Sequence, residues 1–381
     1  MVIEPRRPFL DYYRAHEISP VSQDIGDLTL HIERRTSLYR ALGIAPRFLE
    51  GRTALEFGPG SGHNAIATSA LRPRRYVLVD GNPTGLARAR ALLDRHAPDP
   101  AACVLVESLI ENFATDERFD LVIGEGMIPL QLDPPSFARH IASFVAPGGV
   151  LVFTTQDAAT CLADLVRRLV AASLLPPGLE VEAQVERLRP LFADHLSTLA
   201  GVSRPVDDWI LDQITHPFIG EMFGIDDALG TLEGIGLEPY HASPAFFTVW
   251  RWYKTQVGPA RSIADDVRYG YYDSLASLVD IRLGGRVRHG VDFGKALLRE
   301  CDGFFSELKR AERKTHDFTT AERALHRIAD MLRSCAPLTA QSLDEALELC
   351  DAARRGLPSP ATPALRAFWG HGQQYMSFVA R

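Results

Sequence analysis

Short apolar runs alternate with segments of helical periodicity up to about residue 155. The apolar runs predict buried strands at 53–57, 76–80, 102–107, 119–123 and 150–154. Helices are expected over 27–42, after the first strand, after Asn82 and Pro83, and over 135–145. Strands that alternate with helices predict an α/β fold, a doubly wound and mostly parallel sheet with helices on both faces. Such sheets bind ligands at the carboxyl ends of their strands.

The alternation stops after the fifth predicted strand, where helical periodicity takes over. We expect a helical insertion at 158–224, with Arg167 and Arg168 facing outward, and a C-terminal helical region at 256–381. Two extended runs, 237–241 and 246–253, are predicted to close the sheet as an antiparallel pair. We therefore divide the chain into four parts. Residues 1–50 form an N-terminal helical lead-in, and residues 51–157 with 225–255 form the core. Residues 158–224 form a lid, and residues 256–381 form the C-terminal helical region.

Two details of the C-terminal region carry predictions of their own. Ser342 and Glu345 have the spacing of a capping box and predict a helix that begins there. The apolar tail at 368–378 is expected to pack against the body of the protein.

The first predicted strand ends in three glycines at alternate positions, Gly58, Gly60 and Gly62. Glycine allows close approach of a ligand to the backbone and a positive φ, and the following helix aims N–H groups at the same place. The dinucleotide fingerprint G-x-G-x-x-G would require a glycine where His63 stands. The spacing therefore disfavours a nicotinamide dehydrogenase.

The pattern Glu56-x-Gly58-x-Gly60-x-Gly62 resembles motif I of the class I S-adenosylmethionine-dependent methyltransferases. The resemblance covers residues 28–255, interrupted by the helical insertion. It implies S-adenosyl-L-methionine as cofactor, with the glycine loop under its methionine part and the lead-in at 1–50 covering it. The cofactor-binding residues that it implies are Glu56, Gly58, Pro59, Gly60, Ser61, Gly62, Asn64, Asp80, Gly81, Asn82, Glu107, Ser108, Leu109, Gly124, Glu125 and Gly126.

Two neighbouring strand ends have separate roles in this interpretation. Asp80 ends the second strand about 20 residues after the glycine loop, where a carboxylate can accept hydrogen bonds from ribose hydroxyls. The loop after the third strand runs beside adenine in the family, often with an aspartate where Ser108 stands. The adenine amino group then meets either the Ser108 hydroxyl or the Glu107 carboxylate, with the Leu109 N–H on a ring nitrogen.

Methyl transfer from a sulfonium is an in-line displacement that depends mainly on positioning. A general base is needed only where the acceptor starts protonated. Our candidate catalytic residues are Glu125 at the end of the fourth strand and His195 and His216 in the helical insertion. Glu125 has an alternative interpretation as an exposed loop residue. Candidate ligand contacts also include Tyr12, Tyr13, Arg35 and Tyr39, although packing of the helix against the sheet is the preferred interpretation for each of them.

Composition narrows the classes of protein and partner. With 381 residues, 46% of them hydrophobic and 23% charged, the chain is typical of soluble globular proteins. The net charge of −7 disfavours a broad phosphate-binding surface. Gly124-Glu125-Gly126 stands where nucleic-acid amino-methyltransferases carry Asn/Asp-Pro-Pro-aromatic, which also disfavours DNA and RNA. Five scattered cysteines without a C-x-x-C pair suggest no metal site and a reduced, cytoplasmic protein. No apolar run reaches the ~20 residues of a membrane span.

The sequence thus predicts a methyltransferase that acts on oxygen, nitrogen or carbon of a small molecule, of metabolite or natural-product type. One alternative is a cofactor-binding scaffold without turnover. Another is a transferase that uses a derivative of the cofactor, as in aminopropyl transfer. The helical C-terminal region completes the substrate pocket, forms a homodimer surface, or does both.

Overall fold

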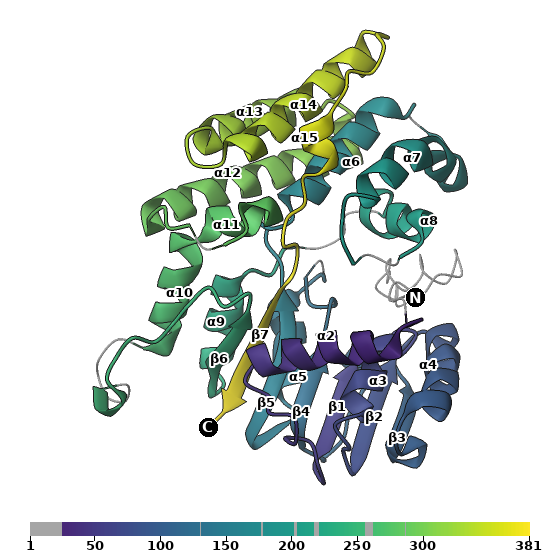
Figure 1. Cartoon of the computed structure of the whole chain (residues 1–381), viewed down its shortest axis with the longest axis vertical. Helices are drawn as coiled ribbons and strands as arrows, with labels where there is room; N and C mark the ends of the chain where they lie inside the picture. The colour runs from purple at the N-terminus through teal and green to yellow at the C-terminus, as the bar shows by residue number, and fades with distance from the viewer. Residues whose placement is uncertain are drawn as a thin grey trace, which may run out of the picture.

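A computed structural model describes residues 25–129, 131–176, 178–201, 204–216, 221–255, 262–285 and 287–381. The candidate contacts Tyr12 and Tyr13 lie outside these residues. A seven-stranded sheet lies beneath a body of helices (Figure 1), and its strand order is β3-β2-β1-β4-β5-β7-β6. The strands are β1 Thr53–Phe57, β2 Arg75–Asp80, β3 Cys103–Glu107, β4 Phe119–Gly124, β5 Val145–Thr155, β6 Leu237–Ser243 and β7 Gln374–Ala380. The predicted doubly wound, mostly parallel sheet is confirmed.

Strand β1 is an inner strand of the sheet and pairs in parallel with both β2 and β4. Its side chains alternate between the two faces. Leu55 and Phe57 join a core that includes α5 (Pro134–Ala142) and α9 (Ile225–Glu233). Ala54 joins a second core on the opposite face. The helices of that second face are α2 (Leu28–Ala41), α3 (His63–Ser69) and α4 (Pro83–His96).

The strand that closes the sheet comes from the C-terminus of the chain. β7 runs antiparallel to both β5 and β6 and fills the position between them. The prediction that 246–253 forms this strand is wrong, since Trp250 is 96% exposed and the segment has no strand. An inner strand needs side chains that can be buried on both faces, and in β7 Met376 and Phe378 on one face and Ser377 on the other are fully buried. The expectation that the tail packs against the body is confirmed.

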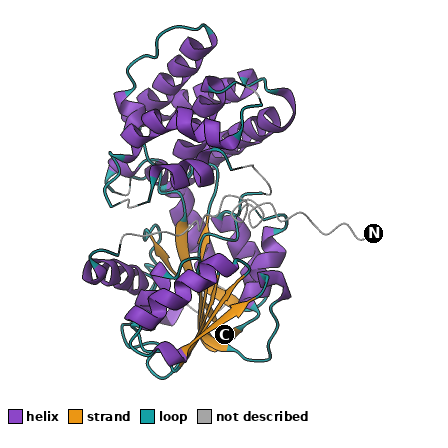
Figure 2. Ribbon diagram, turned by 90° about the vertical axis from the view of Figure 1, so that its right-hand side faces the viewer, coloured by secondary structure: helices purple, strands orange, loops and turns teal. Residues whose placement is uncertain are grey.

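The remaining helices form one body next to the sheet (Figure 2). They are α6 Leu162–Leu174, α7 Val181–Leu196, α8 Val206–Trp209, α10 Ile263–Asp273, α11 Leu275–Val279, α12 Val291–Arg310, α13 Thr319–Leu332, α14 Pro337–Arg354 and α15 Pro363–Arg366. Helix α6, which follows β5, packs against α12 and α14, which precede β7. The two helical segments that are separate in the sequence therefore share one packed body.

Two predictions about these helices are wrong. Arg167 and Arg168 do not face outward, because the first is fully buried and the second is 6% exposed. Ser342 and Glu345 do not begin a helix, since α14 starts at Pro337. Instead, the Ser342 hydroxyl accepts a hydrogen bond from Arg282, and the Glu345 carboxylate accepts one from a backbone N–H of α15.

Candidate functional site

The glycine loop after β1 has a backbone that only glycine adopts easily. Gly58, Gly60 and Gly62 have φ of +63°, +55° and +80°, in the left-handed region where a side chain costs about 1–2 kcal/mol. A Cβ at Gly62 would lie 2.8 Å from the Ala89 Cα, so the loop packs directly on α4. Helix α3 begins at the next residue and directs its first N–H groups toward the loop. The loop has the shape of a cradle for a ligand.

Asp80 joins the glycine loop to the ends of β2 and β3. One carboxylate oxygen accepts a hydrogen bond from the Gly60 N–H at 3.1 Å, and the other accepts one from the Asn82 N–H at 2.8 Å. The Asp80 carbonyl accepts a hydrogen bond from the Ser108 N–H at 3.1 Å. Asn82 caps α4 with its side chain, which accepts from the Thr84 N–H. The structure therefore brings these predicted residues together at one edge of the sheet.

Glu125, directly after β4, is held by side chains from two helices. Arg35 of α2 donates to both carboxylate oxygens, one of them at 3.1 Å, and the Asn64 amide of α3 donates at 3.2 Å. The Glu125 side chain is 14% exposed. The interpretation of Glu125 as an exposed loop residue is wrong, and both of its oxygens are engaged by the protein itself. The next residue, Gly126, donates its N–H to the Thr154 hydroxyl at 2.8 Å.

Glu56 lies beneath the glycine loop and not on its surface. The side chain is 5% exposed and accepts a hydrogen bond from the Tyr76 hydroxyl. Burial, with a further contribution from the charge of Glu125, raises the pKa of Glu56 to about 7. This carboxyl group is placed to support the loop from inside the protein.

The other predicted cofactor residues lie in the glycine loop or at the ends of β2, β3 and β4. Pro59 and Ser61 are buried within the loop, and Glu107 is exposed at the end of β3. The Ser108 hydroxyl donates to the Leu109 carbonyl at 2.9 Å. Gly81 follows β2, and Gly124 ends β4 next to Glu125. That these residues contact the cofactor stays a prediction.

The two candidate catalytic histidines lie in the helical body. The Nδ1 atom of His195 accepts a hydrogen bond from the Arg167 Nε at 3.2 Å, and its ring packs edge-on against Phe192. Burial, reinforced by the charge of Arg167, lowers the pKa of His195 to about 3, so the ring is neutral. His216 is buried, and its carbonyl accepts from Arg168 at 2.6 Å. The contacts described for these histidines are to residues of the helical body and not to the glycine loop.

We expect the substitution His195→Ala to destabilise the protein without weakening cofactor binding. The change removes a buried acceptor from Arg167, and an unsatisfied buried donor costs about 1–3 kcal/mol. Urea denaturation measures the loss, and calorimetry with S-adenosyl-L-homocysteine measures affinity. A stable variant with a lost or displaced pH profile of methyl transfer would instead support the catalytic role that the sequence predicts for His195.

Sequence reasoning missed three side chains at this edge of the sheet. The Met127 methyl group occupies the space into which a Gly58 side chain would point. The Gln373 amide lies 3.6 Å from where a Gly126 Cβ would stand. The charge of Glu125 and burial both raise the pKa of the Tyr375 hydroxyl, which bonds to Arg35. The positions of Gln373 and Tyr375 could not be predicted, because the sequence does not indicate that the C-terminal tail forms a strand of the sheet.

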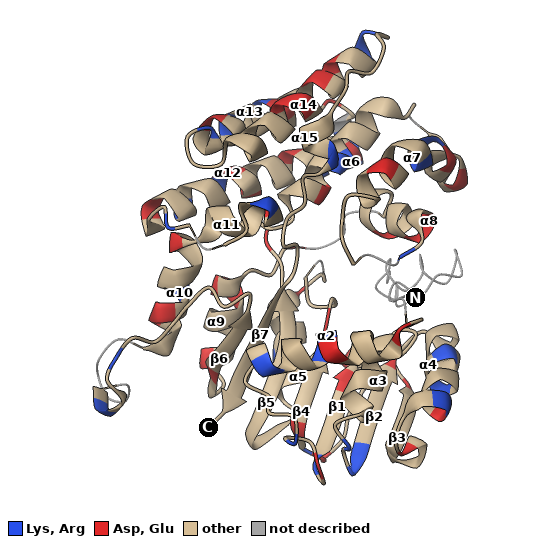
Figure 3. Cartoon of the chain, viewed as in Figure 1, with Lys and Arg blue, Asp and Glu red and all other residues tan. Residues whose placement is uncertain are grey.

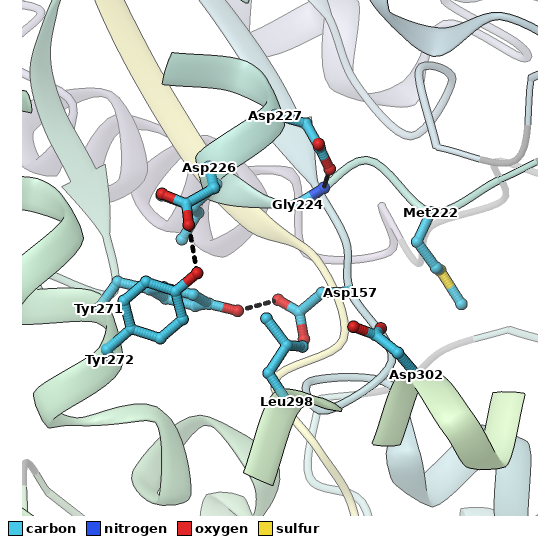
Figure 4. Close-up of a pocket in the computed structure, with 10 residues that line it drawn as sticks. Asp157, Met222, Gly224, Asp226, Asp227, Tyr271, Tyr272, Leu298 and Asp302 are labelled. Atoms are coloured by element: carbon cyan, nitrogen blue, oxygen red, sulfur yellow. Dashed lines mark hydrogen bonds between the residues drawn. The ribbon is translucent and has the colours of Figure 1, made fainter. Parts of the chain in front are cut away.

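A hollow opens between the end of β5 and the helical body (Figure 4). Its lining includes Tyr271 and Tyr272 of α10 and several carboxylates, and the complete lining is Asp157, Met222, Gly224, Ile225, Asp226, Asp227, Tyr271, Tyr272, Leu298 and Asp302. The Tyr271 hydroxyl donates to Asp157 at 2.7 Å. Among the residues described, no His, Cys, Asp or Glu side chains are grouped to hold a metal ion. The hollow therefore combines aromatic walls with negative charge.

A short series of contacts connects this hollow to the glycine loop. Glu221, next to Met222 of the hollow, donates its N–H to the Gln131 carbonyl at 3.3 Å. The Gln131 side chain in turn donates to the Met127 carbonyl at 2.6 Å. Since the Met127 side chain packs against Gly58, these contacts link the segment beside the hollow to the glycine loop.

Comparison with known proteins identifies the domain that carries this edge. The model of a methyltransferase domain family matches residues 31–198. The chain contains a methyltransferase domain. The match spans β1 to β5 of the sheet, together with the glycine loop, Asp80 and Glu125. No curated protein matches the sequence.

Solved structures with similarity to the chain include two methyltransferases. The N-methyltransferase NodS from Bradyrhizobium japonicum WM9, in complex with S-adenosyl-L-homocysteine, is 25% identical over 39% of this chain and 75% of its own, with a TM-score of 0.31. The CcbJ methyltransferase from Streptomyces caelestis is 20% identical over 34% of this chain and 50% of its own, with a TM-score of 0.29. The assignment of the methyltransferase domain rests on the family match and the sheet topology.

S-adenosyl-L-methionine is the cofactor that a methyltransferase domain of this fold implies, and the residues present fit it. The glycine loop leaves room for backbone contact with a ligand, and α3 and α4 begin at the same edge of the sheet. Asp80 supplies carboxylate oxygens next to the loop. Within the described part of the chain, no helix is both long enough and apolar enough to cross a membrane.

Proposed function

We propose that the chain is an S-adenosyl-L-methionine-dependent methyltransferase that acts on a small-molecule acceptor. The observation that carries the proposal is the edge of the methyltransferase domain where Gly60 follows β1, Asp80 ends β2 and Glu125 follows β4. The cofactor supplies an electrophilic methyl group on its sulfonium. The residues of the chain bind and orient, and orientation alone can supply much of the rate enhancement of a displacement.

The acceptor is proposed to approach from the β5 side of the sheet. The hollow at Asp157 lies there and connects through Gln131 and Met127 to the glycine loop. In the view of Figure 3, basic and acidic segments are interspersed over the helical body, without one continuous basic surface. Together with the net charge of −7, this supports a small molecule over a nucleic acid. The carboxylates of the hollow favour acceptors that carry a basic group.

Calorimetry and mass spectrometry test the proposal in two steps. Calorimetry measures the affinity for S-adenosyl-L-methionine and S-adenosyl-L-homocysteine. The full chain is then incubated with the cofactor and pooled amines, phenols and carboxylic acids, and products heavier by one methyl group are detected. Binding with turnover supports the proposal. Binding without turnover on any pool favours a cofactor-binding scaffold, and transfer of an aminopropyl group from the decarboxylated cofactor would favour the other alternative. Absence of binding to both S-adenosyl-L-methionine and S-adenosyl-L-homocysteine overturns the methyltransferase and the scaffold, whereas the aminopropyl transferase is overturned by absence of binding to the decarboxylated cofactor.

Asp302 at the hollow predicts a specific dependence of stability on pH. Loss of solvation at the hollow, followed by the charges of Asp157 and Asp227, raises the pKa of Asp302 to about 6, above the ordinary aspartate value of 3.8, although the residue as a whole is exposed to solvent, which screens part of this effect. A carboxyl group with a raised folded-state pKa binds more protons when folded, so its contribution to stability falls as pH rises from about 4 through 6. We expect Asp302→Asn to be more stable than wild type at pH 7.5, with the difference disappearing at pH 4.

Urea denaturation at the two pH values measures this effect, with Asp116→Asn, in an exposed loop that does not line the hollow, as the control. If both variants behave alike at pH 7.5, the hollow does not raise the pKa of Asp302 in the folded protein.

A further inference from the structure

An ion pair between Arg35 and Glu125 joins the N-terminal helix to the edge of the sheet. The two side chains are 9% and 14% exposed, and the guanidinium contacts both carboxylate oxygens. A planar guanidinium matches a carboxylate in this two-point geometry, and lysine cannot reproduce it. The residues are 90 positions apart in the sequence, so the pair reflects the fold and not local helix chemistry.

Arg35 belongs to a polar stripe along one face of α2. His31, Arg35 and Tyr39 are spaced four residues apart and therefore lie above one another on the helix. His31 Nε2 bonds to the His63 carbonyl at 2.9 Å, and the Tyr39 and Thr68 hydroxyls share a hydrogen bond at 2.5 Å. These outer contacts bind α2 to α3. The middle residue reaches past α3 to Glu125.

Glu125 is the side chain by which the loop after β4 is held. The residues on either side of it are glycines, and Gly126 has a φ of +69°. Glycine gives a backbone many accessible conformations, so a loop of this composition depends on its anchors. Those anchors are Arg35 and the Asn64 amide on the Glu125 carboxylate and the Thr154 hydroxyl on the Gly126 N–H.

Loss of Arg35 would leave Glu125 as a buried charge with one amide donor. A buried carboxylate without its cation is strongly unfavourable, so the side chain would turn toward water and take the loop with it. Met127, two residues further along, packs over Gly58 and would lose its position. The Nε–H of Arg35 is buried and has no hydrogen-bond partner. The guanidinium is therefore not placed there to satisfy all of its own hydrogen bonds, and the ion pair with Glu125 is the interaction that accounts for its position.

We propose that Arg35 is a positioning residue for methyl transfer. It acts through Glu125, which it fixes so that the 124–127 loop stands against the glycine loop before the cofactor arrives. Glu125 accordingly serves as an anchor and not as a general base. This inference rests on the proposed function, because the edge of the sheet that it shapes is the proposed cofactor site.

The test uses the full chain with Arg35→Gln, Arg35→Lys, Glu125→Gln and the double variant Arg35→Gln/Glu125→Gln. Arg40→Gln is the matched control, on the exposed side of the same helix. Calorimetry with S-adenosyl-L-homocysteine gives affinity independently of turnover. We expect Arg35→Gln to weaken binding at least tenfold, Arg35→Lys to restore part of it, and Arg40→Gln to bind like wild type. The double variant should bind S-adenosyl-L-homocysteine no more weakly than the single variant with the lower affinity, because the two substitutions remove the same contact.

Kinetics separate an anchor from a base. With an acceptor found as above, an anchor predicts that Arg35→Gln and Glu125→Gln both raise the KM for the cofactor and leave the pH profile of kcat unchanged. A Glu125→Gln variant that binds normally but loses kcat and its pH profile would overturn the inference. So would equal affinities of Arg35→Gln and Arg40→Gln. If Arg35→Gln does not fold, Arg35→Lys and Glu125→Gln provide the same comparison. Failure of the wild type to bind S-adenosyl-L-homocysteine would instead overturn the proposed function.

Discussion

Replacing Gly60 with valine is expected to lower the affinity for S-adenosyl-L-methionine by about 100-fold, or about 2.7 kcal/mol. Gly60 has a φ of +55°, which a β-branched residue adopts only with strain, and its N–H is bonded to Asp80. A valine side chain there would also project from the loop on which the cofactor is proposed to lie. Calorimetry with the cofactor and with S-adenosyl-L-homocysteine measures the loss.

The control for strain is Gly51→Val, at the opposite end of β1. Gly51 has a φ of +73°, and no atom lies within 4 Å of its would-be Cβ. This variant therefore carries a similar backbone strain without occupying the site. If it loses as much affinity as Gly60→Val, the loss reports general destabilisation, and the loop is not the cofactor site.

Asp80→Ala is the companion change on the neighbouring strand. It removes the acceptor of the Gly60 and Asn82 N–H groups along with the proposed ribose contact. Loss of charged hydrogen bonds of this kind costs about 1.5–3 kcal/mol, so we expect affinity to fall by about 10- to 100-fold. Asp116→Ala, in an exposed loop, should leave affinity unchanged. Unchanged affinity in Asp80→Ala as well would contradict the placement.

The inner strands and their glycine loop could be predicted because the information is local. Strand β1 has the predicted bounds, since a short, mostly apolar run between two turns has few other places in a parallel sheet. Asn82 and Pro83 likewise begin α4 where a helix cap and a first-turn proline predict it. Residues that follow parallel strands then meet at one edge for topological reasons, as Gly60 and Asp80 do.

The closing strand could not be predicted because its pairing is distant in sequence. Residues 374–380 pair with β5 more than 200 positions earlier, whereas 246–253 follows β6 directly and has the same period-2 pattern. Proximity in sequence favoured the wrong segment. The Arg35–Glu125 pair escaped prediction for a similar reason, since nothing in either local pattern indicates its partner. Arginines on an amphipathic helix are usually at the surface, and that expectation misplaced Arg167.

Replacing Arg167 with alanine is expected to lower the free energy of unfolding by about 3 kcal/mol, because it opens a cavity and removes several buried hydrogen bonds. The side chain is fully buried in α6, and its guanidinium carbon lies 3.7 Å from the centre of the Trp369 ring. It donates to His195 at 3.2 Å and to the Leu365 carbonyl at 3.4 Å. Burial lowers the pKa of Arg167 to about 10, so the group is still charged at neutral pH.

The position of these contacts predicts which part of the structure the substitution destabilises. Trp369 and Leu365 precede β7, so Arg167 holds the segment that leads the chain back into the sheet. Urea denaturation should show a lower midpoint for Arg167→Ala, while Arg187→Ala, exposed on α7, should unfold like wild type. Affinity of the folded variant for S-adenosyl-L-homocysteine should be unchanged, since no described contact of Arg167 reaches the glycine loop. A variant as stable as wild type would show that the buried guanidinium is dispensable, and that packing of α6 against α12 and α14 is enough to hold this part of the helical body together.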